Sequence, residues 1–207
     1  QHGRQLAALV ARGCAALKIS VSAKRARLLA TAERLFDAEG FHATGVDRLV
    51  AEAGVVRMTL YKHFASKEAL IAAVLRARHD RFMAAVDAAT AAAEPGAVTL
   101  ALVDAHGRWL AGESPNGCFM VKAMGEFAAH APAVHAAAVQ AKQDLLDRLA
   151  AALERDGLGG EATLARRLLL VLEGGTIAVP VTGVDATLAD TRALATRLLD
   201  DAAATPG

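Results

Sequence analysis

Apolar residues recur at helical spacing along most of the chain. Between residues 24 and 39, Leu28, Leu35 and Phe36 share one face of a helix, and most cations of the segment lie opposite. Gly40 follows at the position where a glycine commonly ends a helix in the left-handed conformation. The pattern therefore predicts an amphipathic helix that buries one face and stops at Gly40.

Two short helices are predicted directly after this one. Thr44 and Asp47 have the spacing of a capping box, which predicts a helix that runs through Ala53. Gly54 ends that helix, and another is expected over about residues 56–63. Two short helices joined by a tight, glycine-containing turn form the helix-turn-helix pattern.

The second of the two short helices has an apolar and a polar face. We expect the two helices to touch through the apolar side chains of Leu49, Val50, Ala53, Val56, Leu60 and Phe64. If Leu60 and Phe64 point inward, the outward residues are Arg57, Met58, Tyr61 and Lys62, flanked by Thr59 and His63. The outward set thus gathers cations, hydroxyl groups and the one tyrosine of the chain.

A helix of this composition suits the major groove of double-stranded DNA. Arg57, near its N-terminus, is placed to contact a guanine edge, and Thr59, Tyr61 and Lys67 can donate to phosphates. Ser66 is expected to cap the next helix, whose first amides add further donors. Packing alone does not require such an outward set, so the sequence favours sequence-specific DNA binding.

The rest of the chain is also predicted to be helical. A long helix should follow Ser66, and later helices are expected at about 98–112, 116–129, 132–155, 161–178 and 187–203. Alanine and leucine, both strong helix formers, dominate, and β-branched runs are few. The predicted fold class is all-α.

Composition narrows the class of protein. Hydrophobic residues make up 54% of the 207 residues and charged residues 22%, which suits a sizeable core. Residues 1–90 contain 14 Lys and Arg but only 8 Asp and Glu, whereas residues 91–207 contain 9 Lys and Arg and 14 Asp and Glu. The N-terminal half is therefore basic, which suits binding to a polyanion. Cys14 and Cys118 are far apart, which favours a reducing cytoplasm. Because no apolar run is long enough to span a bilayer, we expect no membrane partner.

Residues 26–75, "ARLLATAERLFDAEGFHATGVDRLVAEAGVVRMTLYKHFASKEALIAAVL", resemble the N-terminal domain of the TetR family of bacterial transcriptional regulators. The similar features are an opening helix that ends F-x-x-x-G-F, the AGV turn, TLYKHF and SKEAL. Residues 117–127, "GCFMVKAMGEF", are similar to a segment found in many members. The resemblance implies a homodimer that represses transcription from a palindromic operator and is released by a small-molecule effector.

The resemblance also implies a division of the chain. We expect an N-terminal extension at residues 1–21, a DNA-binding domain at 22–68, and a ligand-binding and dimerisation domain at 69–207. Carried over by position, the residues that face the operator are Arg57, Met58, Thr59, Tyr61, Lys62 and His63. Tyr61 and Lys67 would hold phosphates, and Thr44 would bind the DNA backbone.

Three positions depart from the family pattern. Val56 stands where a capping residue is usual, which we expect to cost the helix about 1 kcal/mol. Met58 replaces a usual glycine and points an apolar side chain toward the groove. Gly45 replaces a usual threonine and removes a hydroxyl. These departures bear on the sequence and the affinity of the operator.

The effector and dimer contacts are expected in the rear half. The candidate effector-binding residues are His106, Trp109, Glu113, Phe119, Met120, Met124, Phe127 and His130. Aromatic residues are only 4% of the chain, which favours a pocket lined by aliphatic side chains over one for large flat molecules. The candidate dimer contacts, on the apolar faces of the last two helices, are Leu164, Leu168, Val171, Leu172, Leu188, Leu194 and Leu198.

Other functions stay open at this stage. A metal-responsive regulator would use Glu126, His130 and His135, although a proline interrupts their helical spacing, and a redox-responsive one would use Cys118. A helical scaffold without specific DNA binding, or a helical enzyme, is a further alternative. The sequence contains no HExxH, G-x-S-x-G, phosphate-binding-loop or dinucleotide-binding pattern, so we expect neither an enzyme nor a cofactor.

Overall fold

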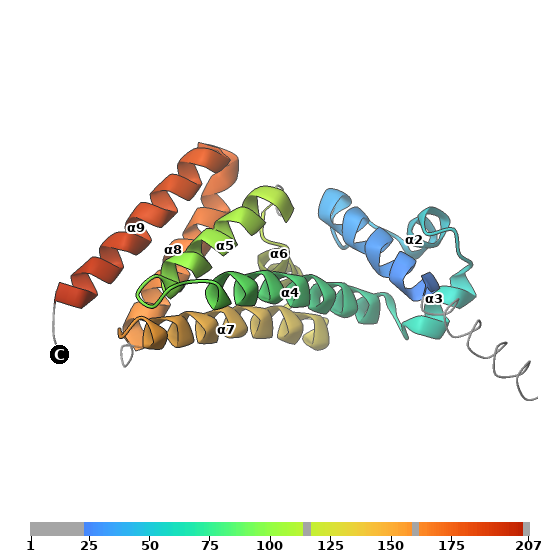
Figure 1. Ribbon diagram of the computed structural model, residues 1–207. Coiled ribbons are helices and arrows are strands. Elements are labelled where there is room, and N and C mark those ends of the chain that lie inside the picture. Colours follow the sequence, from blue (N-terminus) through green and yellow to red (C-terminus); the bar gives the residue numbers. More distant parts are fainter. Residues whose placement is uncertain (1–22, 114–116, 159–161, 205–207) are drawn as a thin grey trace, which may run out of the picture. The chain divides into compact units, whose positions relative to one another are not determined.

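The computed structural model describes residues 23–113, 117–158 and 162–204, and every regular element in these ranges is an α-helix (Figure 1). The all-α prediction is therefore confirmed. The extension expected at residues 1–21 lies outside the described residues. None of the described helices is both long enough and apolar enough to cross a membrane.

The chain forms two compact units that divide between Val74 and Leu75. The first unit contains a helix over residues 23–39, α2 (Val46–Glu52), α3 (Arg57–His63) and the start of α4 (Lys67–Ala91). The second contains the remainder of α4, followed by α5 (Val98–Glu113), α6 (Phe119–Phe127), α7 (Pro132–Arg155), α8 (Ala162–Thr182) and α9 (Val184–Ala204). The α4 helix thus begins in one unit and ends in the other.

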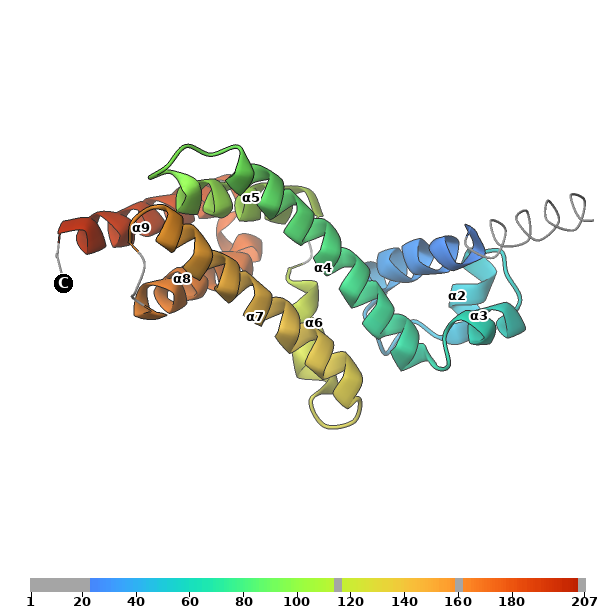
Figure 2. The same ribbon diagram turned by 60° about the horizontal axis from the view of Figure 1, so that its bottom comes forward.

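The first unit is built around the predicted apolar faces. Leu28, Phe36, Leu49 and Leu60 are completely buried, and the helix over 23–39 stops at Gly40, whose φ is 88°. Figure 2 shows α2 and α3 meeting at the turn between them. The burial comes from the helical periodicity of the sequence, which places large apolar residues three and four positions apart.

Two details of the helix ends differ from prediction. Gly45, not Thr44, is the N-cap of α2, so the expected capping box does not form. Thr44 is completely buried and its hydroxyl donates to the carbonyl of Gly40 at 2.8 Å, because the chain turns back on the end of the preceding helix. Val56, expected in the contact between the helices, is 68% exposed because it caps α3 at the turn. The Ser66 cap is confirmed, since its hydroxyl accepts the amide of Ala69 at 3.1 Å.

The second unit has its own core. The α8 helix packs along α9 and α7, α6 packs along α7, and α5 lies against α7 and α9 (Figures 1 and 2). Leu102, Leu145, Leu149 and Leu168 come from three of these helices and are at most 1% exposed. These leucines therefore hold α5, α7 and α8 together by burying apolar surface.

The α8 helix runs four residues past its predicted end at 178. Pro180 lies inside it, where it lacks an amide hydrogen and removes one helical hydrogen bond. The helix continues for a last half-turn, and the hydroxyl of Thr182 donates to the carbonyl of Ala178 at 3.1 Å. Gly183, with φ of 83°, then ends it.

Asp156 joins the end of α7 to the start of α5. Its two carboxylate oxygens accept the amides of Val98 at 2.9 Å and Thr99 at 2.7 Å. Burial opposes the charged form, but the amides of Thr99 and Val98 outweigh it, so the pKa of Asp156 is lowered. The carboxylate therefore caps a helix that is distant in sequence.

Replacing Asp156 with alanine should lower the free energy of unfolding by about 1–2 kcal/mol, the usual range for losing a helix cap. Urea unfolding at neutral pH measures the change. Glu154→Ala, an exposed acidic residue on α7, is the matched control and should shift stability by less than about 0.5 kcal/mol. Equal effects of the two substitutions would show that the Asp156 cap adds no stability.

Candidate nucleic-acid interface and effector pocket

The outward face of α3 is polar, cationic and partly apolar. Arg57, Met58, Tyr61 and Lys62 are all exposed, and Met58 and Tyr61 keep 81% and 46% of their surface open. Leu60, on the other face, is completely buried. The predicted division of this helix is therefore confirmed, and Thr59 and His63 are half-buried at its flanks.

Arg57 does not extend freely into solvent. Its guanidinium donates to Asp47 of α2, and this hydrogen bond is the main reason that the pKa of Arg57 is raised. Both side chains are exposed, so the ion pair contributes little to stability. The pair instead fixes the direction of the guanidinium at the start of α3.

Thr44 and Lys67, which were also predicted to contact DNA, differ in how far they are buried. Thr44 is completely buried, so the predicted contact between its side chain and DNA is wrong. Lys67 is half-buried at the start of α4, where its ammonium donates to the carbonyl of His42 at 3.4 Å. The expected loss of a cap at Val56 is confirmed, because α3 has no side-chain cap.

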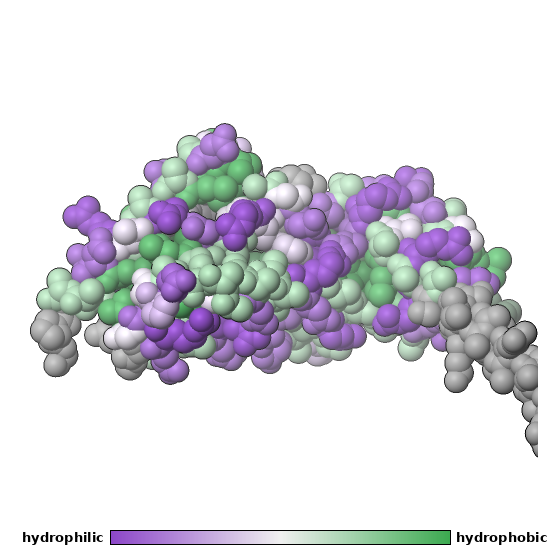
Figure 3. Space-filling model, viewed as in Figure 1, coloured by the Kyte–Doolittle hydropathy of each residue, from purple (hydrophilic) through white to green (hydrophobic). Residues whose placement is uncertain are grey.

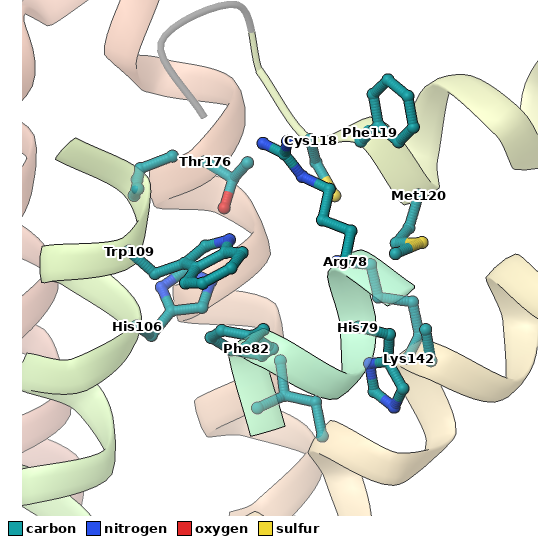
Figure 4. A pocket seen from close by; sticks show the side chains of 13 residues that line it. Arg78, His79, Phe82, His106, Trp109, Cys118, Phe119, Met120, Lys142 and Thr176 are labelled. Carbon is teal, nitrogen blue, oxygen red and sulfur yellow. The ribbon is translucent and has the colours of Figure 1, made fainter. Parts of the chain in front are cut away.

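A cavity of about 60 Å³ lies inside the second unit (Figure 4). A volume of this size is the share of about two molecules of liquid water. Helix α4 contributes Arg78, His79 and Phe82 to its wall. The remaining wall residues come from α5, α7, α8 and the start of α6, and they are His106, Trp109, Leu110, Cys118, Phe119, Met120, Ala141, Lys142, Leu145 and Thr176.

Half of the predicted effector residues line this cavity: His106, Trp109, Phe119 and Met120. The other half do not, and these are Glu113, Met124, Phe127 and His130. Phe127 is 2% exposed and packs against the ring of His130, with centroids 5.4 Å apart, so it belongs to the core under α6. Glu113 contributes its backbone carbonyl, which accepts a hydrogen bond from Arg78.

Arg78 lines the cavity but was not among the predicted effector-binding residues, although the sequence pattern of α4 indicates that it is unusual. Arg78 lies four residues after Val74 and four before Phe82, so a cation interrupts the apolar stripe of α4. Its side chain is only 6% exposed, and its guanidinium lies 5.2 Å from the ring centre of Phe119 and 5.9 Å from that of Trp109. A buried cation between two rings is stabilised by their π faces.

The cavity wall is more aromatic than the composition led us to expect. Figure 4 shows Trp109 and His106 projecting from α5 toward Phe82. The ring centre of Phe82 lies 5.4 Å from that of Trp109 and 6.0 Å from that of His106. The expectation of an aliphatic lining is therefore wrong, because folding gathers the few aromatic side chains of this unit at one place.

Lys142 brings a second positive charge to the cavity. Its ammonium donates to Glu173 at 2.6 Å, and its side chain is 19% exposed. Burial opposes the charge, but the contacts with Cys118 and Glu173 outweigh it, so the pKa of Lys142 is raised. The thiol of Cys118 is free, and its role as a redox sensor stays a prediction.

His106 is neutral in the folded protein. It is 7% exposed, and burial, helped by the charge of Lys142, lowers its pKa to about 4 from the ordinary value of 6.5. Between these two values an unfolded chain carries a proton that the folded chain does not. Stability should therefore fall as the pH falls from 6.5 to 4.

Replacing His106 with glutamine should remove this dependence. The free energy of unfolding of the parent protein, relative to the variant, should drop by up to about 3 kcal/mol between pH 7 and pH 4. Urea unfolding at a series of pH values measures it. Arg108→Gln, on the exposed side of the same helix, should keep the pH slope of the parent protein. A slope unchanged in His106→Gln would contradict the burial of a neutral imidazole.

Helix α4 is tied to α7 beside the cavity. His79 and Asp144 are 2.7 Å apart, and Arg148 pairs with Asp87 at 2.9 Å. The pKa of Asp144 is lowered, mainly by a hydrogen bond from Gln140 and also by His79, against the opposing effect of burial. The wall residues of α4 therefore sit in a network of charged contacts.

Three residues of the predicted dimer interface are buried within the subunit. Leu164, Leu168 and Leu172 are at most 2% exposed and belong to the core, so this part of the prediction is wrong. Val171 and Leu188 are half-buried, and Leu198 packs against the core. Leu194 is 55% exposed. The large apolar residues that α8 exposes are Leu170, Ile177 and Val181.

The predicted metal ligands do not gather. Among the residues that the structure describes, no three His, Cys, Asp or Glu side chains form a group suited to a metal ion. His130 packs on Phe127 instead.

Comparison with known proteins agrees with the helix-turn-helix geometry. The sequence model of "Bacterial regulatory proteins, tetR family" matches residues 28–74. The transcriptional activator FasR of Mycolicibacterium smegmatis is 40% identical over 63 residues, which are 30% of this chain and 29% of FasR. The regulator RutR of Escherichia coli is 41% identical over 69 residues, 33% of this chain and 32% of RutR. The match thus spans about a third of each curated relative.

Solved structures extend the likeness to most of the chain. A TetR-family transcriptional regulator from Streptomyces coelicolor superposes with a TM-score of 0.80 at 30% identity, covering 86% of this chain and 89% of that one. The multidrug-binding protein EbrR, complexed with ethidium, gives a TM-score of 0.66 at 26% identity, covering 84% of this chain and 97% of EbrR. The protein is a transcriptional regulator with a DNA-binding helix-turn-helix, and the chain belongs to the TetR family.

Proposed function

We propose that the protein is a dimeric transcriptional repressor that leaves its operator when a small molecule enters the cavity of the second unit. The main support for the proposal is that α4 connects the helix-turn-helix to the wall of the cavity. This helix starts at Lys67, directly after the helix-turn-helix, and places Arg78, His79 and Phe82 in the cavity wall. A ligand that changes the packing of these three side chains acts on the helix that also bears the DNA-binding unit.

The DNA contacts are assigned to the outward face of α3. Arg57 is suited to a guanine edge, and the exposed methionine, Met58, to a thymine methyl group. Tyr61, Lys62 and Lys67 are suited to phosphates, with Thr59 and His63 at the flanks of the contact. Asp47 is a positioning residue, because its carboxylate holds the guanidinium of Arg57.

The dimer contact is assigned to an outer stripe of α8, defined as Leu170, Ile177 and Val181. These residues lie seven and four positions apart, on one face of the helix, and are 72%, 67% and 85% exposed. Figure 3 shows hydrophobic surface where α8 and α9 join. Leu194 of α9 is a further exposed apolar residue, with 55% of its surface open. Apolar side chains so open to water favour contact with the same face of a second copy.

These assignments give the two parts of the chain different functions. Residues 22–68 are proposed to bind DNA, and residues 69–207 to bind the effector and to form the dimer. Two-fold symmetry then presents two α3 helices to successive major grooves of a palindrome. By reciprocal linkage, an effector that weakens operator binding must itself bind less tightly to the DNA-bound protein.

An organic effector is supported by the character of the cavity. The wall combines aromatic rings with a few polar groups, as small-molecule sites generally do. EbrR, which is similar over most of this chain, is described as a multidrug-binding protein and is complexed with ethidium. The direction of regulation, repression, comes from the family resemblance, and FasR is named an activator.

A promoter assay tests the proposed direction. Transcription in vitro from a promoter that carries the selected operator should fall when the protein is added. A rise in transcription would contradict repression while leaving specific DNA binding intact. Arg57→Ala protein is the matched control and should leave transcription unchanged at the same concentration.

A further inference from the structure

Asp47 and Arg57 place opposite charges side by side on the exposed surface of α2 and α3. Asp47 lies in the first turn of α2, and Arg57 is the first residue of α3. The side chain of Asp47 is 80% exposed and that of Arg57 is 57% exposed. Nη2 of Arg57 donates a hydrogen bond to Oδ1 of Asp47. The guanidinium that is proposed to contact guanine therefore has a carboxylate directly beside it.

The carboxylate of Asp47 is not used to hold α2 in place. Arg48, the next residue, instead pairs with Glu52 at 3.3 Å and with Glu39, at the end of the preceding helix, at 3.6 Å. A first-turn aspartate stabilises the start of its helix, but that role requires no contact with Arg57. Among the described residues, Arg57 is the only hydrogen-bond partner of Asp47. The second carboxylate oxygen is thus available to an outside donor.

The pair combines donors and acceptors that DNA can use. A guanidinium has five N–H donors, and Asp47 accepts from only one of its nitrogens, so donors remain for a two-point contact. An ionised carboxylate accepts hydrogen bonds at both oxygens and donates none. The exposed surface therefore offers two neighbouring donors from Arg57 and, next to them, an acceptor from Asp47.

A G·C base pair has the complementary pattern in the major groove. It presents N7 and O6 of guanine, which are both acceptors, and then the N4 amino group of cytosine, which is a donor. An A·T pair instead presents the N6 amino group of adenine beside N7, and this donor opposes a guanidinium. An arginine alone matches only the guanine, whereas Arg57 together with Asp47 matches both bases of the pair.

We propose that Asp47 is a specificity-determining residue, whose carboxylate accepts a hydrogen bond from N4 of the cytosine that pairs with the guanine bound by Arg57. This assignment rests on the proposed contact between Arg57 and a guanine edge. It gives Asp47 a role in addition to holding the guanidinium. At a wrong base pair the carboxylate finds no donor there and adds only repulsion from the phosphates, which increases discrimination.

An operator that contains N4-methylcytosine isolates this contact. The methyl group replaces the N4 hydrogen that points into the major groove, and the pairing with guanine is kept. The operator is selected from random DNA with the parent protein, and the guanine is located as the position at which Arg57→Ala loses its base preference. Methylation of the opposite cytosine should weaken binding of the parent protein about tenfold or more, measured by fluorescence anisotropy.

Matched variants show whether the effect passes through the carboxylate. Asp47→Ala has no acceptor at this place and should bind the methylated and the unmethylated operator within about threefold of each other. Glu39→Ala removes a different carboxylate of the same unit, which pairs with Arg48, and should keep the full tenfold loss of the parent protein. Methylation of a cytosine outside the operator should weaken binding of none of the proteins. Thermal unfolding of each variant checks that it is folded.

The outcomes distinguish the role of Asp47 from the proposed function on which it rests. Equal binding of the parent protein to the two operators would overturn the cytosine contact and leave the guanine contact of Arg57 standing. An equal tenfold loss in folded Asp47→Ala would also overturn it, because the loss would not depend on the carboxylate. If Arg57→Ala loses base preference at no position, both contacts are wrong. A selection that yields no preferred sequence would contradict specific DNA binding itself.

Discussion

Replacing Ile177 with aspartate is expected to separate the dimer and to weaken operator binding about 100-fold or more. Ile177 is 67% exposed in the subunit, so the subunit should fold as before. In the proposed dimer the residue lies in the contact between the two copies. Two buried carboxylates without partners would then oppose association. Sedimentation at micromolar concentration measures the first effect, and fluorescence anisotropy on the operator the second.

Val139→Asp is the matched control. Val139 is also an exposed apolar residue, 41% open, but it lies on α7 and outside the outer stripe of α8. It should leave both association and operator binding unchanged. A dimer that persists in Ile177→Asp would place the interface elsewhere, and a monomeric parent protein would contradict the dimer itself.

Replacing Arg57 with alanine should reduce the discrimination between the operator and one changed base pair by about 5- to 150-fold. The reason is that a guanidinium donates to two acceptors of guanine at once, and alanine donates to neither. Because Arg57 is exposed in the free protein, the substitution should leave the fold intact. Anisotropy titrations with the operator and with a set of single-base variants give the ratio.

Lys67→Ala serves to distinguish the loss of a phosphate contact from the loss of a base contact. A lost phosphate contact should weaken binding to all DNA about equally and should lower the salt slope by about one. Arg57→Ala should instead flatten the preference at one position. If both variants behave alike, Arg57 contacts phosphate and not a base edge.

The helix-turn-helix was predictable because local signals determine it. Leu49, Leu60 and Phe64 recur at helical spacing, and Gly54, whose φ is 60°, marks the turn between the two helices. The failures at Thr44 and Val56 arose at helix ends. There the capping pattern depends on how the chain turns back on the preceding helix, which sequence spacing does not specify.

The surface proposed for the dimer was not predictable for a different reason. A helix that is buried within a subunit on one side and in an interface on the other has two apolar faces. The stronger leucine pattern, with Leu164, Leu168 and Leu172, is buried inside the subunit. The outer stripe of Leu170, Ile177 and Val181 is weaker, and only the fold distinguishes the two.

The cavity proposed to bind the effector was predicted in part. His106, Trp109, Phe119 and Met120 were chosen by residue type, and the fold brings them together. Lys142 was missed because a lysine on an amphipathic helix is ordinarily a surface residue. Its burial depends on a distant partner, Glu173, whose position comes only from the packing of α7 on α8.

We propose that the protein binds one operator specifically and leaves it when the cavity is filled. The most direct test is fluorescence anisotropy with tiled fragments of the DNA around its own gene, at several salt concentrations and with excess nonspecific competitor. We predict tight binding to a palindromic fragment and its loss on addition of a ligand that quenches Trp109. Weak binding that is uniform across all fragments, or binding that no cavity ligand weakens, would contradict this mechanism.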